Sequence, residues 1–323
     1  MTATPAARSR RLDLPDRYDF AGTVGALAMS RHDPCARVAD GGFWWATRTP
    51  GGPSTLNLRR DGRHLVATGH GPGAEWVLDR ADAIAGLRDD VSGFGELAAR
   101  HPVVARLART HAGLRLPATG RVFQRLVRSI LEQKVTGKEA YRGYAATVRH
   151  FHRATGGEPA PGPLPRLLLP PDPAVVAATP YWVFHPFGVE QRRADTLLRA
   201  AAVAARLEES GDAAEATRRL TSIPGIGPWT AAEVVRVAFG DPDAVSVGDY
   251  HIPHMVSWAL AGEARAGARE STAGTLSPAD RRMLELLEPF AGHRGRVCVL
   301  VEQGAPAPPR FGPRLPIRSF ASY

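Results

Sequence analysis

The chain has 323 residues, 44% of them hydrophobic, which is enough to bury a sizeable core and suggests two or three packed units. A formal net charge of +9 favours a polyanionic partner, although a generally basic chain with solvated arginines would give the same value. Two cysteines, Cys35 and Cys298, are too few for a disulfide framework or for a four-cysteine zinc or iron–sulfur site.

Membrane insertion and secretion are not indicated. No apolar run approaches the roughly 18 residues that a membrane span needs. The first residues, MTATPAARSRRLDL, lack the apolar centre of a signal peptide. We therefore expect a reduced, cytoplasmic, nucleoid-associated protein without a membrane partner, and nothing in the sequence requires more than a monomer.

The N-terminal part has the signals of a small α+β unit. Residues 1–14 are rich in small residues and arginine and predict a disordered basic tail. Over residues 15–95, the alternating runs STLNLRR and RHLVATGHG flank the pair Asp61-Gly62, which is a strong signal for a β-hairpin.

From residue 96 to residue 303 the sequence predicts helices. In VFQRLVRSILEQKV, five apolar residues from Phe123 to Leu131 recur on one helical face, with arginines on the other. A proline-rich stretch over 159–173 predicts a loop that crosses one face of the protein. Residues 304–323 are proline-rich and basic, so we expect an extended or partly disordered tail. The chain is therefore mostly α with an N-terminal α+β domain.

The stretch IPGIGPWTAAEVVRVAFG, from Ile223 to Gly240, predicts a tight glycine turn between two helices. Glycines let the backbone approach an anion, and free N–H groups at the start of the second helix point toward it. The stretch lacks the third glycine of a dinucleotide fingerprint, and the sequence holds no Walker loop. Taken alone, such a turn is more often a plain connection than a phosphate clamp.

Asp249 stands just before the next apolar helix. A carboxylate there is most often a helix cap, yet it also suits a reaction that builds positive charge on a sugar. Asp249, His251 and His254 also have a possible metal-ligand spacing, although histidines near a helix start are usually packing or surface residues.

The run LTSIPGIGPWTAAEVVRVAFGDPDAVSVGDYHI resembles the helix-hairpin-helix, glycine-proline loop and aspartate signature of the base-excision DNA glycosylases. It is most similar to the bacterial 3-methyladenine DNA glycosylase II family. The similarity extends upstream through LRLPATGRVFQRLVRSILEQKVTGKEAY and FGVEQRRADTLLRAA, and downstream into AGHRGRVCVLVE. It covers about 90% of the chain and is thin at the N-terminus.

The resemblance implies a two-lobed helical fold whose hairpin, residues 221–230, clamps the backbone of double-stranded DNA that contains a damaged base. The implied DNA contacts are Gly225, Ile226, Gly227, Thr230, Gln133 and Lys134. Main-chain carbonyls of Thr221, Ile223 and Gly225 would hold a monovalent cation, Na⁺ or K⁺, and no other cofactor is implied.

By the same resemblance Asp249 is the catalytic carboxylate, acting on a nucleotide rotated out of the duplex. The base pocket would contain Trp229, Tyr250, Glu233 and His293. Trp229 and Tyr250 offer aromatic surfaces for stacking on a cationic base. Ala26, Glu233 and His293 instead stand where well-known members carry aromatic residues, which puts the usual broad substrate range in doubt.

Two further positions depart from relatives. Lys134, which follows Gln133, stands where the family inserts an apolar or glutamine side chain into the gap left by the flipped base. Trp229 occupies the hairpin position at which bifunctional relatives carry a Schiff-base lysine, so a monofunctional enzyme is expected. The sequence thus predicts a glycosylase that excises alkylated purines of the 3-methyladenine type. A non-catalytic protein that binds damaged DNA and a metal-dependent hydrolase remain as alternatives.

Overall fold

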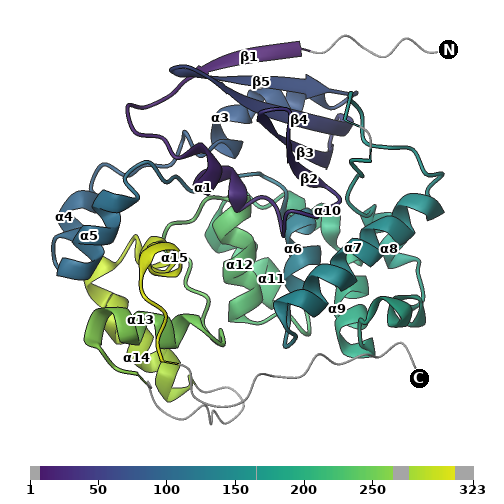
Figure 1. Cartoon of the computed structure of the whole chain (residues 1–323). Helices are drawn as coiled ribbons and strands as arrows, with labels where there is room; N and C mark the ends of the chain where they lie inside the picture. Colours follow the sequence, from purple (N-terminus) through teal and green to yellow (C-terminus); the bar gives the residue numbers. More distant parts are fainter. Residues whose placement is uncertain (1–7, 165, 265–275, 310–323) are drawn as a thin grey trace.

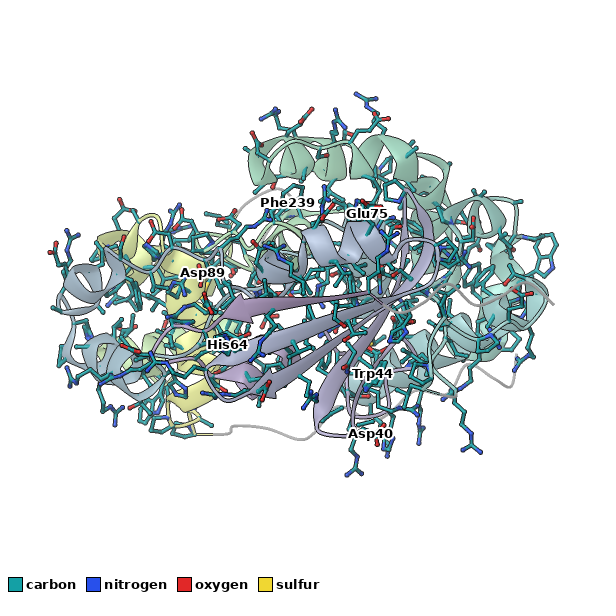
Figure 2. The ribbon with its side chains drawn as sticks, turned by 90° about the horizontal axis from the view of Figure 1, so that it is seen from above. Asp40, Trp44, His64, Glu75, Asp89 and Phe239 are labelled. Carbon is teal, nitrogen blue, oxygen red and sulfur yellow. The ribbon has the colours of Figure 1, made fainter. Side chains whose placement is uncertain are left out.

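The computed structural model describes residues 8–164, 166–264 and 276–309. A small antiparallel sheet lies across the top of a mostly helical body (Figure 1). Seen from above, the strands run across the centre of the molecule, with the C-terminal helices on one side and the teal helices on the other (Figure 2). The predicted fold class, helical with an N-terminal α+β unit, is confirmed.

The sheet has five strands in the order β1-β5-β4-β3-β2, and every neighbouring pair is antiparallel. Their bounds are β1 Arg8–Asp13, β2 Ala36–Ala39, β3 Gly42–Thr49, β4 Gly52–Asp61 and β5 His64–His70. Asp61 pairs directly with His64, so the predicted hairpin turns through Gly62, whose φ of +59° favours glycine.

The sheet packs its inner face on three short helices. These are α1 Phe20–Gly25, α2 Ala74–Asp79 and α3 Ala81–Ile84. Strand β5 alternates between buried and half-buried residues, as one covered face requires, and Leu56 and Leu58 of β4 are completely buried. One residue of α12, Val237, also belongs to this core, so the sheet unit and the helical body share a packed surface.

The disorder predicted for residues 1–14 is wrong for residues 8–13, which form β1 along the edge of β5. All of β1 is exposed except Leu12. An edge strand with one buried side chain has almost no apolar alternation for a sequence pattern to reveal, because main-chain pairing holds it in place.

The first lobe is the helical core that surrounds α6. It consists of α6 Val122–Leu131, α7 Gly137–Ala154, α8 Pro173–Ala177, the 3-10 helix η1 Tyr181–Phe187, α9 Gln191–Ala202, α10 Ala204–Glu208, α11 Ala213–Thr221 and α12 Pro228–Ala238. The apolar face predicted on α6 lies in its centre, with Leu126, Ile130 and Leu131 fully buried.

The second lobe combines two stretches that lie far apart in the sequence. Its members are α4 Phe94–Ala98, α5 Pro102–Thr110, α13 Ile252–Ala261, α14 Pro278–Leu287, the 3-10 helix η2 Glu288–Phe290 and α15 Arg294–Gly304. Figure 1 shows the blue helices α4 and α5 beside the yellow-green C-terminal helices. Their side chains form one apolar core.

The proline-rich stretch 159–173 crosses the sheet unit, as predicted. Ala160 and Leu167 pack on Trp44 of β3, and the Leu168 amide donates to the Pro34 carbonyl at 2.8 Å. The tail predicted over 304–323 begins at the end of α15, and its residues 310–323 lie outside the described residues. Among the helices described, none has both the length and the apolar character to cross a membrane.

Candidate active site and hairpin

The turn between α11 and α12 is anchored by two buried isoleucines. Ile223 and Ile226 both point into the first lobe, and the Ile226 amide donates to the Ile223 carbonyl at 3.0 Å. Gly227 precedes Pro228, the first residue of α12, and no side chain caps this helix start. The first N–H groups of α12 are therefore not bound by a capping side chain and can meet an external anion.

The two glycines of the turn have different physical roles. Gly225 has a φ of +99°, and a Cβ there would lie 2.2 Å from the Thr196 hydroxyl oxygen. Gly227 has a φ of −102°, and a Cβ there would meet nothing within 4 Å. Gly225 is therefore required by the fold, whereas Gly227 leaves the surface of the turn open.

Gln133 joins the turn between α6 and α7 to the hairpin. Its side-chain amide donates to the Gly225 carbonyl at 3.1 Å and to the Thr230 hydroxyl at 2.9 Å. Gln133 thus joins two segments that are predicted to contact DNA, the turn around residue 133 and the hairpin over 221–230. Their contact with DNA stays a prediction.

Lys134 is exposed and has a left-handed backbone with φ +54°, which is uncommon for a residue with a side chain. Its turn is fixed on both sides. Arg193 donates to the Leu131 carbonyl at 3.0 Å, and Thr136 and Glu139 form a capping box at the start of α7. Such strain persists only where neighbouring contacts hold it, so Lys134 is presented to solvent in one fixed backbone geometry.

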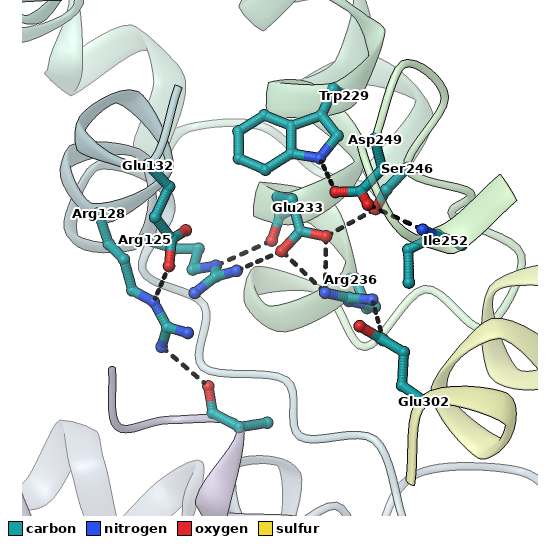
Figure 3. A network of polar contacts seen from close by, with 11 residues as sticks. Arg125, Arg128, Glu132, Trp229, Glu233, Arg236, Ser246, Asp249, Ile252 and Glu302 are labelled. Carbon is teal, nitrogen blue, oxygen red and sulfur yellow. Dashed lines mark hydrogen bonds and ion pairs between the residues drawn. The ribbon is translucent and has the colours of Figure 1, made fainter. Parts of the chain in front are cut away.

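Asp249 lies at the end of the crossing segment, residues 239–251, which leads from α12 in the first lobe to α13 in the second. Its carboxylate is half-buried and accepts three hydrogen bonds. Oδ1 accepts from the His251 backbone amide at 2.6 Å and from the Ile252 amide at 2.9 Å, and Oδ2 accepts from the Trp229 indole at 2.9 Å. The contacts with Ile252 and Trp229 are drawn in Figure 3. Asp249 therefore binds the first amides of α13 and is also held by Trp229 of α12, the helix that follows the hairpin.

Tyr250 and His251 follow on the same surface. Tyr250 is 48% exposed, and its ring meets that of His251 edge to face at 4.8 Å. Across the described ranges, no cluster of three histidine, cysteine, aspartate or glutamate side chains could hold a metal ion. Asp249, His251 and His254 thus do not form such a cluster.

Glu233 lies one turn beyond Trp229 on α12 and is buried in an ionic network. Its carboxylate accepts from Arg125 at 2.6 Å, from Arg236 at 2.7 Å and from the Ser246 hydroxyl at 2.6 Å (Figure 3). Burial by itself would raise the pKa of Glu233, but the guanidinium groups of Arg236 and Arg125 outweigh it and lower the pKa to about 2. The carboxylate therefore remains ionised at physiological pH.

His293 has a different set of neighbours. It precedes α15, its ring meets Phe94 at 5.2 Å, and its Nδ1 accepts from Arg296 at 3.1 Å. Burial and the nearby Arg296 charge lower the pKa of His293. It faces α4 in the second lobe, while Trp229 and Glu233 project from α12. Its place in a base pocket, like those of Glu233, Trp229 and Tyr250, stays a prediction.

The main-chain oxygens predicted to hold a cation lie around the turn. The Ile223 carbonyl accepts from Ile226 and the Gly225 carbonyl from Gln133, and each keeps a second lone pair. Thr221 is the last residue of α11, where carbonyls point out of the helix end. These donors are chemically suited to Na⁺ or K⁺.

Sequence reasoning missed the arginines of the network. Arg125 was placed on the polar face of α6, but it is only 7% exposed and packs against α12, where its Nε also donates to the Glu233 carbonyl at 2.9 Å. Helical periodicity separates apolar from polar faces and gives no sign that one arginine of a polar face is buried. Ser246 had no sequence signal at all.

Two known proteins are similar to this chain in sequence. No family model matches the chain. Two curated proteins, each named "Probable bifunctional transcriptional activator/DNA repair enzyme AlkA", come from the Mycobacterium tuberculosis strains CDC 1551 and H37Rv. Each is 28% identical over 258 residues, which is 77% of this chain and 50% of the relative. The chain thus spans about half the length of the curated relatives it matches.

Solved structures agree on the fold. The 3-methyladenine DNA glycosylase of Archaeoglobus fulgidus superposes with a TM-score of 0.70 at 19% identity, over 91% of this chain and 97% of the other. The chain therefore has the fold of the helix-hairpin-helix DNA glycosylases and is similar in sequence to the AlkA proteins. The family resemblance predicted from the sequence is thereby confirmed.

A glycosylase/lyase also shares this fold. The 8-oxoguanine glycosylase/lyase of Clostridium acetobutylicum, solved with double-stranded DNA, superposes with a TM-score of 0.64 at 12% identity, over 92% of this chain and 96% of the other. The fold therefore does not choose between glycosylases and glycosylase/lyases, and the distinction depends on side chains.

The ionic network gives a stability prediction. Glu233→Gln is expected to lower the free energy of unfolding by about 3 kcal/mol at pH 7, because two guanidinium groups lose their ionised partner. The pKa of Glu233 is about 2 in the fold against an ordinary 4.5, so this contribution is present above pH 4.5 and is lost as the pH falls toward 2. Urea denaturation at pH 7 and pH 3 measures it.

The difference between wild type and Glu233→Gln should shrink at pH 3. Glu75→Gln is the control, because Glu75 pairs with Arg8 on the surface and should contribute little at either pH. A Glu233→Gln variant as stable as wild type at pH 7 would contradict the account of the network.

Proposed function

We propose that this chain is a monofunctional DNA glycosylase that flips alkylated purines of the 3-methyladenine type out of double-stranded DNA and hydrolyses their N-glycosidic bond, in the cytoplasm. The observation that carries the proposal is the Trp229–Asp249 hydrogen bond, which holds a carboxylate at the junction of the two lobes beside the hairpin. The curated relatives are named as DNA repair enzymes, and the Archaeoglobus protein of the same fold is a 3-methyladenine DNA glycosylase.

The chemistry asks little of the protein beyond electrostatics. An alkylated purine already carries positive charge and leaves readily, so the sugar develops oxocarbenium character. A fixed carboxylate stabilises that charge while water attacks C1′. Asp249 suits this role because its two oxygens are fixed by three N–H donors and need no reorganisation during the reaction.

The single-step reaction is supported by the residue types available. A Schiff base with an abasic sugar needs a primary amine, and Lys134 and Lys138 are the two lysines of the chain. Both lie in or next to the turn between α6 and α7, whereas Trp229 beside Asp249 has no nucleophile.

Asp249→Asn tests the mechanism. Base release from methylated duplex DNA, followed by chromatography of the freed bases in EDTA, should fall below detection, because the neutral amide cannot stabilise the developing cation. Affinity for duplex should be unchanged or higher, because a negative charge near phosphates is removed. Asp212→Asn is the matched control, since Asp212 caps α11 but has no contact with Trp229.

Release of 3-methyladenine or 7-methylguanine by wild type and Asp212→Asn alone supports the proposal. Full activity in Asp249→Asn would overturn the mechanism. No base release from wild type, with duplex binding retained, would instead favour the non-catalytic damage-binding protein.

Gly227→Val tests the phosphate clamp. The backbone accepts valine there, but the added methyl groups would occupy the open side of the turn, so affinity should fall about equally for every duplex sequence. Gly93→Val is the control, because Gly93 also precedes a helix and faces open space. Fluorescence anisotropy on two unrelated duplexes measures both, and a loss confined to one sequence would refute the clamp.

Lys134→Ala tests the insertion role. Single-turnover excision should slow by about tenfold, because the flipped-out state loses the side chain that fills the gap in the duplex. Lys138→Ala is the control, since Lys138 is also an exposed lysine and lies four residues away. An unchanged excision rate in Lys134→Ala would remove Lys134 from this role. Borohydride should trap no covalent adduct with wild type or with either variant.

A further inference from the structure

The crossing segment is tied to α12 by two side-chain contacts. Trp229 and Glu233 lie four residues apart on α12, so both project from the same face of the helix. Trp229 bonds to Asp249, and Glu233 bonds to Ser246, three residues earlier in the crossing segment (Figure 3). The segment therefore meets the helix at two points one turn apart.

Ser246 fixes the backbone from which Asp249 projects. It is 3% exposed, its hydroxyl donates to Glu233 Oε1 at 2.6 Å, and its carbonyl accepts from the Asp249 amide at 3.2 Å. A shift of Ser246 would thus be passed to Asp249 through one hydrogen-bonded turn. The crossing segment contains no helix or strand that would hold this spacing by itself.

Glu233 is a rigid acceptor for Ser246. Arg125 of α6 binds both the carboxylate and the main-chain carbonyl of Glu233, and Arg236 binds the carboxylate from the same helix. Arg236 also lies 3.9 Å from Glu302 of α15. Two guanidinium groups therefore hold the carboxylate, and the hydroxyl of Ser246 meets a partner that has little freedom to move.

Two other side-chain anchors of the crossing segment lead to the second lobe. Asp243 pairs with Arg294, the first residue of α15, and the Gly248 amide donates to Asp280 of α14 at 2.7 Å. These contacts attach the segment to the second lobe. Side-chain attachment to α12, whose helix carries Trp229, comes through Glu233 and Trp229.

We propose that Glu233 acts through Ser246 as a positioning residue, setting the distance between Asp249 and the hairpin helix that carries Trp229. This inference rests on the proposed function, since it assigns the ionic network to the reaction of Asp249. It also gives position 233 a role other than contact with a flipped base. Small displacements of a reacting group cost large factors in rate, so a loosened segment should slow excision more than binding.

Ser246→Ala is the test, because it removes the link and leaves Glu233 with both arginines. Single-turnover base release from methylated duplex, at saturating enzyme, is expected to slow by about tenfold or more. Affinity for a duplex that contains a stable abasic analogue should stay within about twofold of wild type. Ser246→Thr, which keeps the hydroxyl, should restore most of the rate.

Ser129→Ala is the matched control. Ser129 lies on α6, is completely buried, and its hydroxyl makes no hydrogen bond within the described part of the chain. It should change neither rate nor affinity. A wild-type rate in Ser246→Ala, or an equal loss of rate and affinity together with a lowered Tm, would overturn the positioning role.

The proposed function and this inference fail in different ways. If wild type releases no base, the proposed function fails. If wild type releases bases and Asp249→Asn does not, while Ser246→Ala keeps the full rate, the function stands and only the positioning role is refuted.

Discussion

The buried charge of Glu233 is the constraint on which the centre of the molecule depends. A carboxylate removed from water costs several kcal/mol unless ionised partners surround it, and Arg125 and Arg236 supply those partners from two helices. This requirement fixes α6 against α12 more narrowly than apolar packing would, because guanidinium hydrogen bonds tolerate little change in distance or angle. The hairpin leads directly into α12, so its position relative to α6 is fixed as well.

Around this centre, the crossing segment, the hairpin and the turn between α6 and α7 come together. The crossing segment brings Asp249 from the second lobe to Trp229 of the first, and Gln133 joins the turn between α6 and α7 to the hairpin. A carboxylate, an uncapped helix start and a strained lysine turn are all held by side-chain hydrogen bonds in their surroundings. The proposed reaction on a rigid polymer needs such fixed relations, because substrate contacts and reacting groups must match simultaneously.

Much of this fold could be predicted from the sequence, since periodicity and glycine placement report local structure directly. The hairpin at Asp61-Gly62, the apolar face of α6 and the helix–turn–helix around Gly225 follow from such patterns. Strand β1 was missed because an edge strand with one buried residue has no apolar alternation. Asp249 and Trp229 are each predicted as site residues from the sequence, but their mutual hydrogen bond is a tertiary contact that spacing alone does not imply.

The ionic network around Glu233 could not be predicted from the sequence, because it too is formed by tertiary contacts. Arg125 lies more than 100 residues before Glu233 and Ser246 in the sequence. Arginine, glutamate and serine are all ordinarily surface residues. Only the fold shows that the three are buried together. The departure at Glu233 from an aromatic position was visible in the sequence, but its partners were not.

The second lobe has a consequence for how the chain acquires its structure. Helices α4 and α5 are synthesised about 140 residues before α13, yet their apolar residues are buried against α13 and α15. The apolar surface of α4 and α5 has no partner until α13 and α15 have been synthesised, because the contact between them encloses the entire first lobe. Contacts of such high sequence separation form slowly. The junction that carries Asp249 therefore depends on contacts that close a loop of about 140 residues.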